Sequence, residues 1–188
     1  MENKTVIVIN GAGGVGKDTL IQVVSHKFTV WNISSVDRIK EIAKSAGWNC
    51  VKDEAGRKLL ADLKQVFTAY NNFPFRYLVA QYEQFKRLNG DVMFVHIREP
   101  EEILKFKQVV PCKTLLVTRS GSEEWGLDFE KNVANFEYDY TFDNSKPIQE
   151  SGAVFIELVT QIINDSQVPE APVPVTEVVQ PAEIAETE

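Results

Sequence analysis

Short apolar runs alternate along the chain with longer segments in which apolar residues recur every three or four positions. Runs of strand length occur at 4–10, 29–34, 92–97, 113–118 and 138–142. Helical spacing occupies 18–28, 36–46, 53–70, 74–88, 101–108 and 153–164. Strands that alternate with helices in this way predict a three-layer α/β/α domain around a mostly parallel five-stranded sheet. In such sheets, ligands bind at the carboxyl ends of the strands.

Several of the predicted helices begin at residues that stabilise a helix N-terminus. Ser34 or Ser35 is expected to cap the helix at 36–46, and Asp53 is expected to cap the next one. Pro74 is expected in the first turn of the helix at 74–88, because a missing backbone N–H is harmless there.

The length of 188 residues leaves room for one ordinary domain. Hydrophobic residues make up 44% of the chain and charged residues 25%, which is typical of globular proteins and excludes a wholly disordered chain. No run approaches the roughly 18 consecutive apolar residues of a membrane span. The first residues lack the pattern of a secretory signal, so we expect none. Cys50 and Cys112 stand far apart without metal-ligand neighbours, so we expect a reduced, cytoplasmic protein.

Negative charge is concentrated at the C-terminal end of the chain. Residues 166–188 contain five Glu, four Pro and no Lys or Arg, a composition that favours a disordered tail on a folded domain at 1–165. The other 22 acidic and 20 basic residues nearly balance. We therefore expect no nucleic-acid partner and no membrane contact, and at most a weak partner for the tail. The sequence leaves both a monomer and a homodimer open.

A glycine-rich loop follows the first strand and precedes the first helix. Its residues are Gly11, Ala12, Gly13, Gly14, Val15, Gly16, Lys17, Asp18 and Thr19, which match the pattern G-x-x-x-x-G-K. Glycines let such a loop bring backbone N–H groups up to phosphate oxygens. The helix N-terminus adds partial positive charge, and Lys17 reaches the β- and γ-phosphates of a nucleotide. The loop therefore predicts a P-loop NTPase-type fold with a site for nucleotide phosphates.

The position after the lysine departs from the common pattern. Ser or Thr usually stands there, and its hydroxyl joins the ligands of a bound Mg²⁺, whereas this chain has Asp18 followed by Thr19. A carboxylate is a suitable oxygen ligand for Mg²⁺. A negative charge in the first turn of a helix is also favourable without any metal. Both interpretations of Asp18 stay open at this point, and Thr19 is the second candidate ligand.

The same loop also satisfies the dinucleotide-binding pattern G-x-G-x-x-G, through Gly11, Gly13 and Gly16. That pattern requires an acidic residue about 20 positions later, and Asp37 stands near that position. Lys17 decides against this alternative, because dinucleotide-binding folds have no use for an ammonium group there. Hydride transfer is therefore the weakest of the functions considered.

The form G-x-x-G-x-G-K-D-T resembles the loop of the phage-type deoxynucleoside monophosphate kinases, and more broadly that of the nucleoside monophosphate kinase group. Further segments resemble stretches of these kinases, namely SSVDRIK at 34–40, FVHIREPEE at 94–102 and YDYTFDNSKPIQE at 138–150. The region 50–88 has no counterpart that we identify.

The resemblance implies phosphoryl transfer from Mg²⁺-bound ATP to a small-molecule phosphate acceptor, with a nucleoside monophosphate as the expected acceptor. It implies that Asp37 and Arg38 bind the acceptor and that Arg98 serves the acceptor or transfer site. Arg119 ends the fourth strand and is a candidate to contact the nucleotide. Lys17, Arg98 and Arg119 are thus the expected catalytic residues, while each arginine retains the alternative of an ordinary solvated charge.

Two departures from the kinase pattern bear on activity. The third strand would normally end in an Asp that orients Mg²⁺, but this chain has His96, a poor ligand for that ion. We expect His96 to be a packed strand-end side chain rather than a catalyst. The lid expected at 120–131 has four acidic residues and no arginine, although lids of the group usually supply positive charge.

The leading hypothesis is a kinase that transfers the γ-phosphoryl of ATP to a nucleoside or deoxynucleoside monophosphate. A P-loop kinase of another small molecule, or a nucleotide-binding regulatory protein with weakened catalysis, is the alternative. Aromatic residues between 67 and 85 follow helical spacing and predict core packing. If the kinase hypothesis holds, some of them would also line the pocket for the acceptor base.

Overall fold

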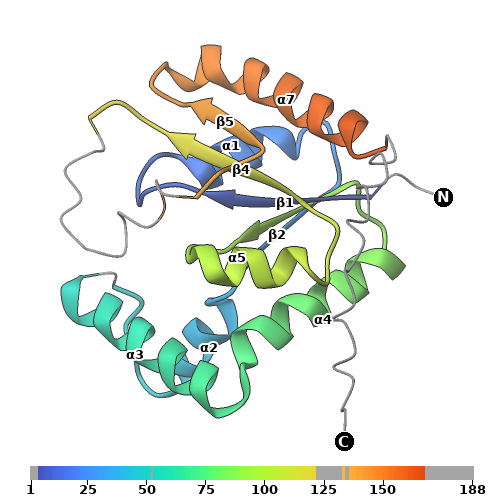
Figure 1. The fold of residues 1–188 in the computed structure, drawn as a ribbon. Helices are drawn as coiled ribbons and strands as arrows, with labels where there is room; N and C mark the ends of the chain where they lie inside the picture. The colour runs from blue at the N-terminus through green and yellow to red at the C-terminus, as the bar shows by residue number, and fades with distance from the viewer. Residues whose placement is uncertain (1–3, 52, 122–132, 134–135, 168–188) are drawn as a thin grey trace, which may run out of the picture.

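The computed structural model describes residues 4–51, 53–121, 133 and 136–167. Within these residues, five parallel strands form one sheet in the order β2-β3-β1-β4-β5 (Figure 1). The strands are β1 Thr5–Asn10, β2 Val30–Ser34, β3 Val92–His96, β4 Lys113–Thr118 and β5 Tyr140–Asp143. The predicted α/β class and the five-stranded sheet are confirmed.

Helices cover both faces of the sheet. They are α1 Lys17–Val24, α2 Asp37–Ser45, α3 Glu54–Asn71, α4 Phe73–Arg87, α5 Pro100–Lys107 and α7 Ile148–Asp165. α1 and α7 lie on one face, while α4 and α5 lie on the other (Figure 1). α2 and α3 pack against each other beyond this second layer, around a small core of their own. The fold therefore has the three layers that the sequence predicts.

β1 lies at the centre of the sheet, and all six of its residues are buried. Its side chains alternate between the two cores, because successive residues of a strand point to opposite faces. Ile7 and Ile9 join the core beneath α1 and α7, whereas Val6 and Val8 join the core beneath α4 and α5. The loop that follows β1 therefore starts from the most buried strand of the domain.

Two of the predicted helix starts are confirmed and one is wrong. Asp53 caps α3 by accepting a hydrogen bond from the Gly56 backbone N–H at 2.7 Å, and Pro74 stands in the first turn of α4. At α2 the cap position is Val36, and no side chain caps it. Asp37 holds this turn instead, because its carboxylate accepts a hydrogen bond from the Ser34 N–H at 2.7 Å.

α7 begins at Ile148, five residues before the predicted start at 153. Ser151 and Gly152, which precede the predicted start, are both buried inside the helix. A Cβ atom on Gly152 would lie 3.2 Å from Val23 Cγ1 of α1. The glycine therefore lets α7 approach α1 closely and does not end the helix.

Two further boundaries differ from the prediction. β5 begins at Tyr140, not at 138, because the side chain of Asp139 accepts the Thr114 backbone N–H at 2.7 Å and replaces strand pairing there. α1 ends at Val24, not at 28. The following residues keep helical spacing through turns, and the Phe28 N–H still donates to the Val24 carbonyl at 3.1 Å.

The predicted lid at 120–131 lies outside the described residues apart from Ser120 and Gly121, and so does the predicted tail from residue 168 onward. Both stay predictions. Among the described helices, none combines the length and the apolar character needed to cross a membrane.

Candidate functional site

The glycine-rich P-loop (residues 11–19) connects β1 to α1 at the carboxyl edge of the sheet (Figure 1). Gly11, Gly14 and Gly16 have φ angles of 140°, 82° and 92°, values that side chains disfavour. At Gly11 a Cβ atom would also lie 2.2 Å from the Val117 carbonyl oxygen of β4. The loop therefore needs glycine both for its conformation and for its closeness to the neighbouring strand.

Gly16 is the cap residue of α1 and lies against Asn144, the residue after β5. A Cβ atom on Gly16 would lie 2.5 Å from Asn144 Nδ2. Asn144 is buried, and its Nδ2 donates a hydrogen bond to the Val15 carbonyl at 2.8 Å. The loop is thus fixed from behind by a side chain that lies far away in the sequence.

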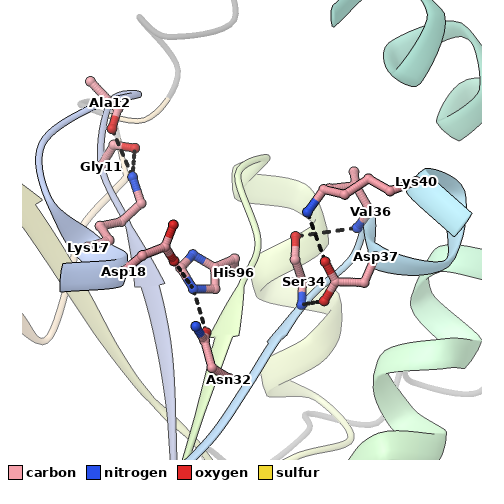
Figure 2. Close-up of polar contacts among 10 residues, drawn as sticks. All are labelled: Gly11, Ala12, Lys17, Asp18, Asn32, Ser34, Val36, Asp37, Lys40 and His96. Carbon is pink, nitrogen blue, oxygen red and sulfur yellow. Dashed lines mark hydrogen bonds and ion pairs between the residues drawn. The ribbon is translucent and has the colours of Figure 1, made fainter. Parts of the chain in front are cut away.

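Lys17 folds back over the P-loop. Its Nζ donates to the Gly11 carbonyl at 2.6 Å and to the Ala12 carbonyl at 2.8 Å (Figure 2). The ammonium group is thus held above the loop, at the N-terminus of α1, where an anion is favoured. Phosphate oxygens placed in the loop would lie between this ammonium and the backbone N–H groups. This arrangement fits a nucleoside triphosphate.

Asp18 and Thr19 stand in the first turn of α1, and both are exposed. Asp18 Oδ1 lies 3.8 Å from His96 Nε2 (Figure 2). Mg²⁺ bound to a nucleotide takes most of its ligands from phosphate and water and only one or two from protein. A carboxylate and a hydroxyl beside the loop fit that requirement. Among the described residues, no group of three or more His, Cys, Asp or Glu gathers as a metal cage.

His96 ends β3 beside the P-loop. Its Nε2 lies 2.8 Å from Asn32 Oδ1 of β2 (Figure 2). Burial lowers the pKa of His96 to about 4, and Lys17 acts in the same direction, while Asp18 opposes the shift. The imidazole is therefore neutral at neutral pH, and its Nε2–H donates to Asn32. The predicted description of a packed strand-end side chain agrees with this geometry.

Arg98 and Arg119 come from the two strands that flank β1. Arg98 follows β3, and Arg119 follows β4; both are exposed at the edge that carries the P-loop. The Arg98 carbonyl accepts a hydrogen bond from Asn10 Nδ2 at 3.0 Å, while Asn10 Oδ1 accepts the Gly11 N–H at 2.9 Å. Asn10 thus ties the backbone of Arg98 to the start of the loop.

Asp37 and Arg38 lie farther along the same edge, after the outer strand β2. Asp37 Oδ1 accepts a hydrogen bond from Lys40 Nζ at 2.9 Å, and its other oxygen holds the Ser34 N–H (Figure 2). Arg38 is exposed and pairs with Glu41. The structure thus gives Asp37 a role in shaping the turn into α2. Figure 2 shows these contacts as a group separate from the one around Lys17 and His96.

A cavity of about 180 Å³ opens between the sheet edge and the helices α3, α4 and α5. Its lining residues are Ser35, Thr68, Asn72, Phe75, Leu78, Ile97, Glu101, Glu102 and Lys105. The Lys64–Glu102 ion pair at 2.7 Å and Lys105 Nζ, 4.7 Å from the centre of the Phe75 ring, stand at this cavity. The cavity combines one aromatic wall with charged and amide groups. A small polar molecule with a flat apolar part suits such a lining.

Sequence reasoning missed three asparagines at the site. Asn10 and Asn32 stand in strand segments. A polar residue among apolar ones there was the signal that could have indicated a role at the site. Asn144 belongs to a segment that resembles the kinase group, but the motif assigned it no role. Its hydrogen bond to the P-loop requires the tertiary fold and could not be read from the chain.

No protein-family profile and no curated protein matches this sequence. A candidate kinase from Chloroflexus aurantiacus is similar in structure, with 16% identity, a TM-score of 0.53, and coverage of 88% of this chain and 99% of that chain. A shikimate kinase from Bacteroides thetaiotaomicron has 14% identity, a TM-score of 0.49 and coverage of 85% and 98%. A gluconokinase from Sinorhizobium meliloti has 10% identity, a TM-score of 0.48, and coverage of 87% of this chain and 95% of that chain. Similarity at this level of identity concerns the fold. The chain shares its α/β fold with the Chloroflexus protein.

Proposed function

We propose that this protein is an ATP-dependent phosphotransferase that moves the γ-phosphoryl of ATP to a nucleoside or deoxynucleoside monophosphate. One observation carries the proposal: Lys17 lies over a glycine loop that opens a helix, and the strands on either side of β1 are followed by Arg98 and Arg119. This geometry concentrates positive charge and backbone donors at one edge of the sheet, as phosphoryl transfer requires.

The P-loop binds the phosphates of ATP in this account. Backbone N–H groups of the loop and the α1 N-terminus face the β-phosphate, and Lys17 leaves the Gly11 and Ala12 carbonyls to contact phosphate oxygens. Asp18 and Thr19 would hold Mg²⁺, which neutralises charge on the phosphates when bound. His96 stays neutral and keeps the β3 end hydrogen-bonded to Asn32.

Transfer itself needs positioning more than covalent help from the protein. The acceptor oxygen attacks the γ-phosphorus while the bond to the bridging oxygen breaks and ADP leaves. A monophosphate acceptor brings an oxygen that is already anionic, so no side chain has to remove a proton. Arg98 and Arg119 neutralise the negative charge that the two phosphate groups bring together.

The cavity beside Ser35 and Ile97 is our proposed site for the acceptor base. Ile97 directly precedes Arg98, so a molecule in the cavity can direct its phosphate toward that arginine and the P-loop. Phe75 offers a face for stacking, and Asn72 offers an amide that can hydrogen-bond a base edge. The resemblance of segment 94–102 to nucleoside monophosphate kinases supports the same class of acceptor.

One observation favours a second candidate function. His96 stands where a metal-orienting carboxylate is expected, and burial keeps its pKa low, so the side chain is a neutral imidazole at that point. A nucleotide-binding regulatory protein with weak turnover would tolerate such a replacement. Formation of product without any partner protein separates the two candidates.

The test is ADP formation from ATP and Mg²⁺ against a panel of ribo- and deoxyribonucleoside monophosphates, with hydroxyl-bearing small molecules as a second panel. The Lys17→Ala variant serves as the blank, and the Lys58→Ala variant, changed on the exposed surface of α3, serves as the matched control. We expect turnover with one or a few monophosphates in the wild type and in Lys58→Ala. Turnover only with hydroxyl acceptors would refute the nucleotide acceptor, and ATP binding without turnover would favour the regulatory protein.

A further inference from the structure

The short segment that follows β5 contacts two other loops at the carboxyl edge of the sheet. Asn144 Nδ2 donates to the Val15 carbonyl of the P-loop at 2.8 Å, and the Asn144 backbone N–H donates to the Thr118 carbonyl at 2.8 Å. Asn144 is 5% exposed, so both bonds are shielded from water. A single residue thus links the P-loop to the end of β4.

Val15 is fixed on two sides as a result. Its side chain is buried in the core beneath α1 and α7, and its carbonyl accepts the amide of Asn144. Gly16 follows with a positive φ and leaves space for the amide that a side chain would fill. The backbone between Val15 and Lys17 therefore has little freedom to rotate its N–H groups away from a phosphate.

The same segment also holds the residues on either side of Arg119. Thr118 accepts from Asn144, and the Ser120 N–H donates to Ser145 Oγ at 2.8 Å. The P-loop and the backbone of Arg119 are thus tied to one short stretch of chain.

We propose that Asn144 is a positioning residue that sets the affinity for ATP by holding the P-loop in its phosphate-binding form before the nucleotide arrives. The inference rests on the proposed function. The apparent affinity for a nucleotide equals the intrinsic affinity multiplied by the fraction of free molecules in which the loop is already ordered. The hydrogen bond to Val15 raises that fraction, although Asn144 itself does not touch the phosphates in this account.

The decisive variant is Asn144→Asp. It keeps the size and shape of the side chain but replaces the N–H donor with a carboxylate oxygen, which repels the Val15 carbonyl. We expect the Kd for ATP with Mg²⁺ to rise about tenfold or more, as loss of a buried hydrogen bond implies. We expect kcat at saturating ATP to change by less than about threefold, because the transferring groups are untouched.

Protonation of the introduced carboxyl should restore ATP affinity in part. A general loss of stability would not show such a recovery. A protonated carboxyl has an O–H that can donate to the Val15 carbonyl again. The ratio of the variant Kd to the wild-type Kd should therefore shrink as pH falls from 8 to 5.5. A second variant, Asn144→Ala, should weaken ATP binding at both pH values without such a rescue.

Thr114→Val is the matched control. Thr114 is buried at the opposite, amino end of β4, and its hydroxyl exchanges hydrogen bonds with Asp139. Its loss should lower the melting temperature while leaving the Kd for ATP within about twofold of the wild type. If Asn144→Asp and Asn144→Ala behave as this control does, the positioning role is overturned and Asn144 is a purely structural residue.

Amide hydrogen exchange of the nucleotide-free proteins separates a failure of this inference from a failure of the proposed function. The Gly16 and Lys17 amides should exchange faster in both Asn144 variants than in the wild type and in Thr114→Val. A wild type that binds no ATP would refute the proposed function. In that event, unchanged exchange at Gly16 and Lys17 would overturn the ordering of the loop by Asn144, and faster exchange would support it.

Discussion

His96 Nε2 lies 2.8 Å from Asn32 Oδ1, which joins the ends of β3 and β2 beside the P-loop. The imidazole is 19% exposed, and burial lowers its pKa to about 4, with Lys17 acting in the same direction and Asp18 opposing it. His96 is therefore a neutral donor that orders the sheet edge. His96 thus has a structural role at a position where the kinase pattern would place a charged Asp.

The low pKa of His96 predicts that the folded state loses stability in mild acid. The unfolded chain binds a proton near pH 6.5, whereas the folded chain binds it only near pH 4, so stability falls as pH drops through that range. Between pH 7.5 and pH 5 we expect the free energy of unfolding to fall by roughly 2 kcal/mol on account of this side chain. Urea denaturation at both pH values, in Mg²⁺-free buffer, measures the change.

The His96→Gln variant isolates this contribution, because Gln keeps an N–H for Asn32 and does not titrate. The wild type should lose more stability than the variant over the same pH interval. Equal losses in the two proteins would show that the imidazole is not held neutral by burial.

Removal of the Lys17 ammonium should abolish detectable ATP binding. The side chain supplies a positive charge that this account places directly on the β- and γ-phosphates, and a charged hydrogen bond is among the strong ones. We expect the Kd of Lys17→Ala for ATP with Mg²⁺ to rise at least about 100-fold by calorimetry, with little change in melting temperature. An affinity close to that of Lys58→Ala would refute the P-loop assignment.

A substitution of Asp18 distinguishes its two interpretations, a ligand of Mg²⁺ and a favourable charge at the start of a helix. If its carboxylate holds Mg²⁺, the Asp18→Asn variant should need about tenfold more Mg²⁺ for half-maximal ATP binding. Its melting temperature should change little, because the side chain is 87% exposed. A lower melting temperature with an unchanged Mg²⁺ titration would instead support the favourable charge in the first turn of α1.

The two arginines should differ in their kinetic effects. Arg98 lies next to the proposed acceptor cavity, so Arg98→Ala should raise the KM for the acceptor more than it lowers kcat. Arg119→Ala should lower kcat by about 100-fold at saturating substrates, as expected for a group that stabilises charge during transfer. Arg87→Ala, at the end of α4, is the control. Kinetics of both site variants equal to those of Arg87→Ala would make the arginines surface charges.

Phe75 tests the proposed acceptor cavity without touching the P-loop. Phe75→Leu should raise the KM for a nucleoside monophosphate by about tenfold, since stacking on a base contributes in the range of 1–3 kcal/mol. The Kd for ATP should stay as in the wild type. An acceptor KM that does not change would place the base outside this cavity.

Much of the fold could be predicted from the spacing of apolar residues in the sequence. Each strand and each described helix was predicted within a few residues, because apolar periodicity reflects burial on one or two faces. The exceptions have tertiary causes. Gly152 lay outside the predicted helix but is part of α7, where it lets the helix pack against α1. Asp139 was predicted as part of a strand but bonds the Thr114 backbone instead.

The sequence predicted those parts of the candidate site that depend on residues close together in the chain. The spacing of Gly11, Gly16 and Lys17 alone predicts the phosphate loop, because its function depends on consecutive backbone groups. Asn144 could not be assigned a role, since its partner Val15 is 129 residues away in the chain. The sequence predicted Asp37 as an acceptor contact, whereas the structure shows its oxygens engaged by Ser34 and Lys40. The role of Asp37 and that of Arg38 in acceptor binding stay predictions.

The most direct test of the central claim is to follow the labelled γ-phosphoryl of ATP. The protein is incubated with γ-labelled ATP, Mg²⁺ and a mixture of nucleoside monophosphates, and the products are separated and identified by mass. The account predicts a labelled nucleoside diphosphate with the wild type and none with Lys17→Ala. No labelled diphosphate from a wild type that binds ATP, or equal labelling by Lys17→Ala, would contradict it.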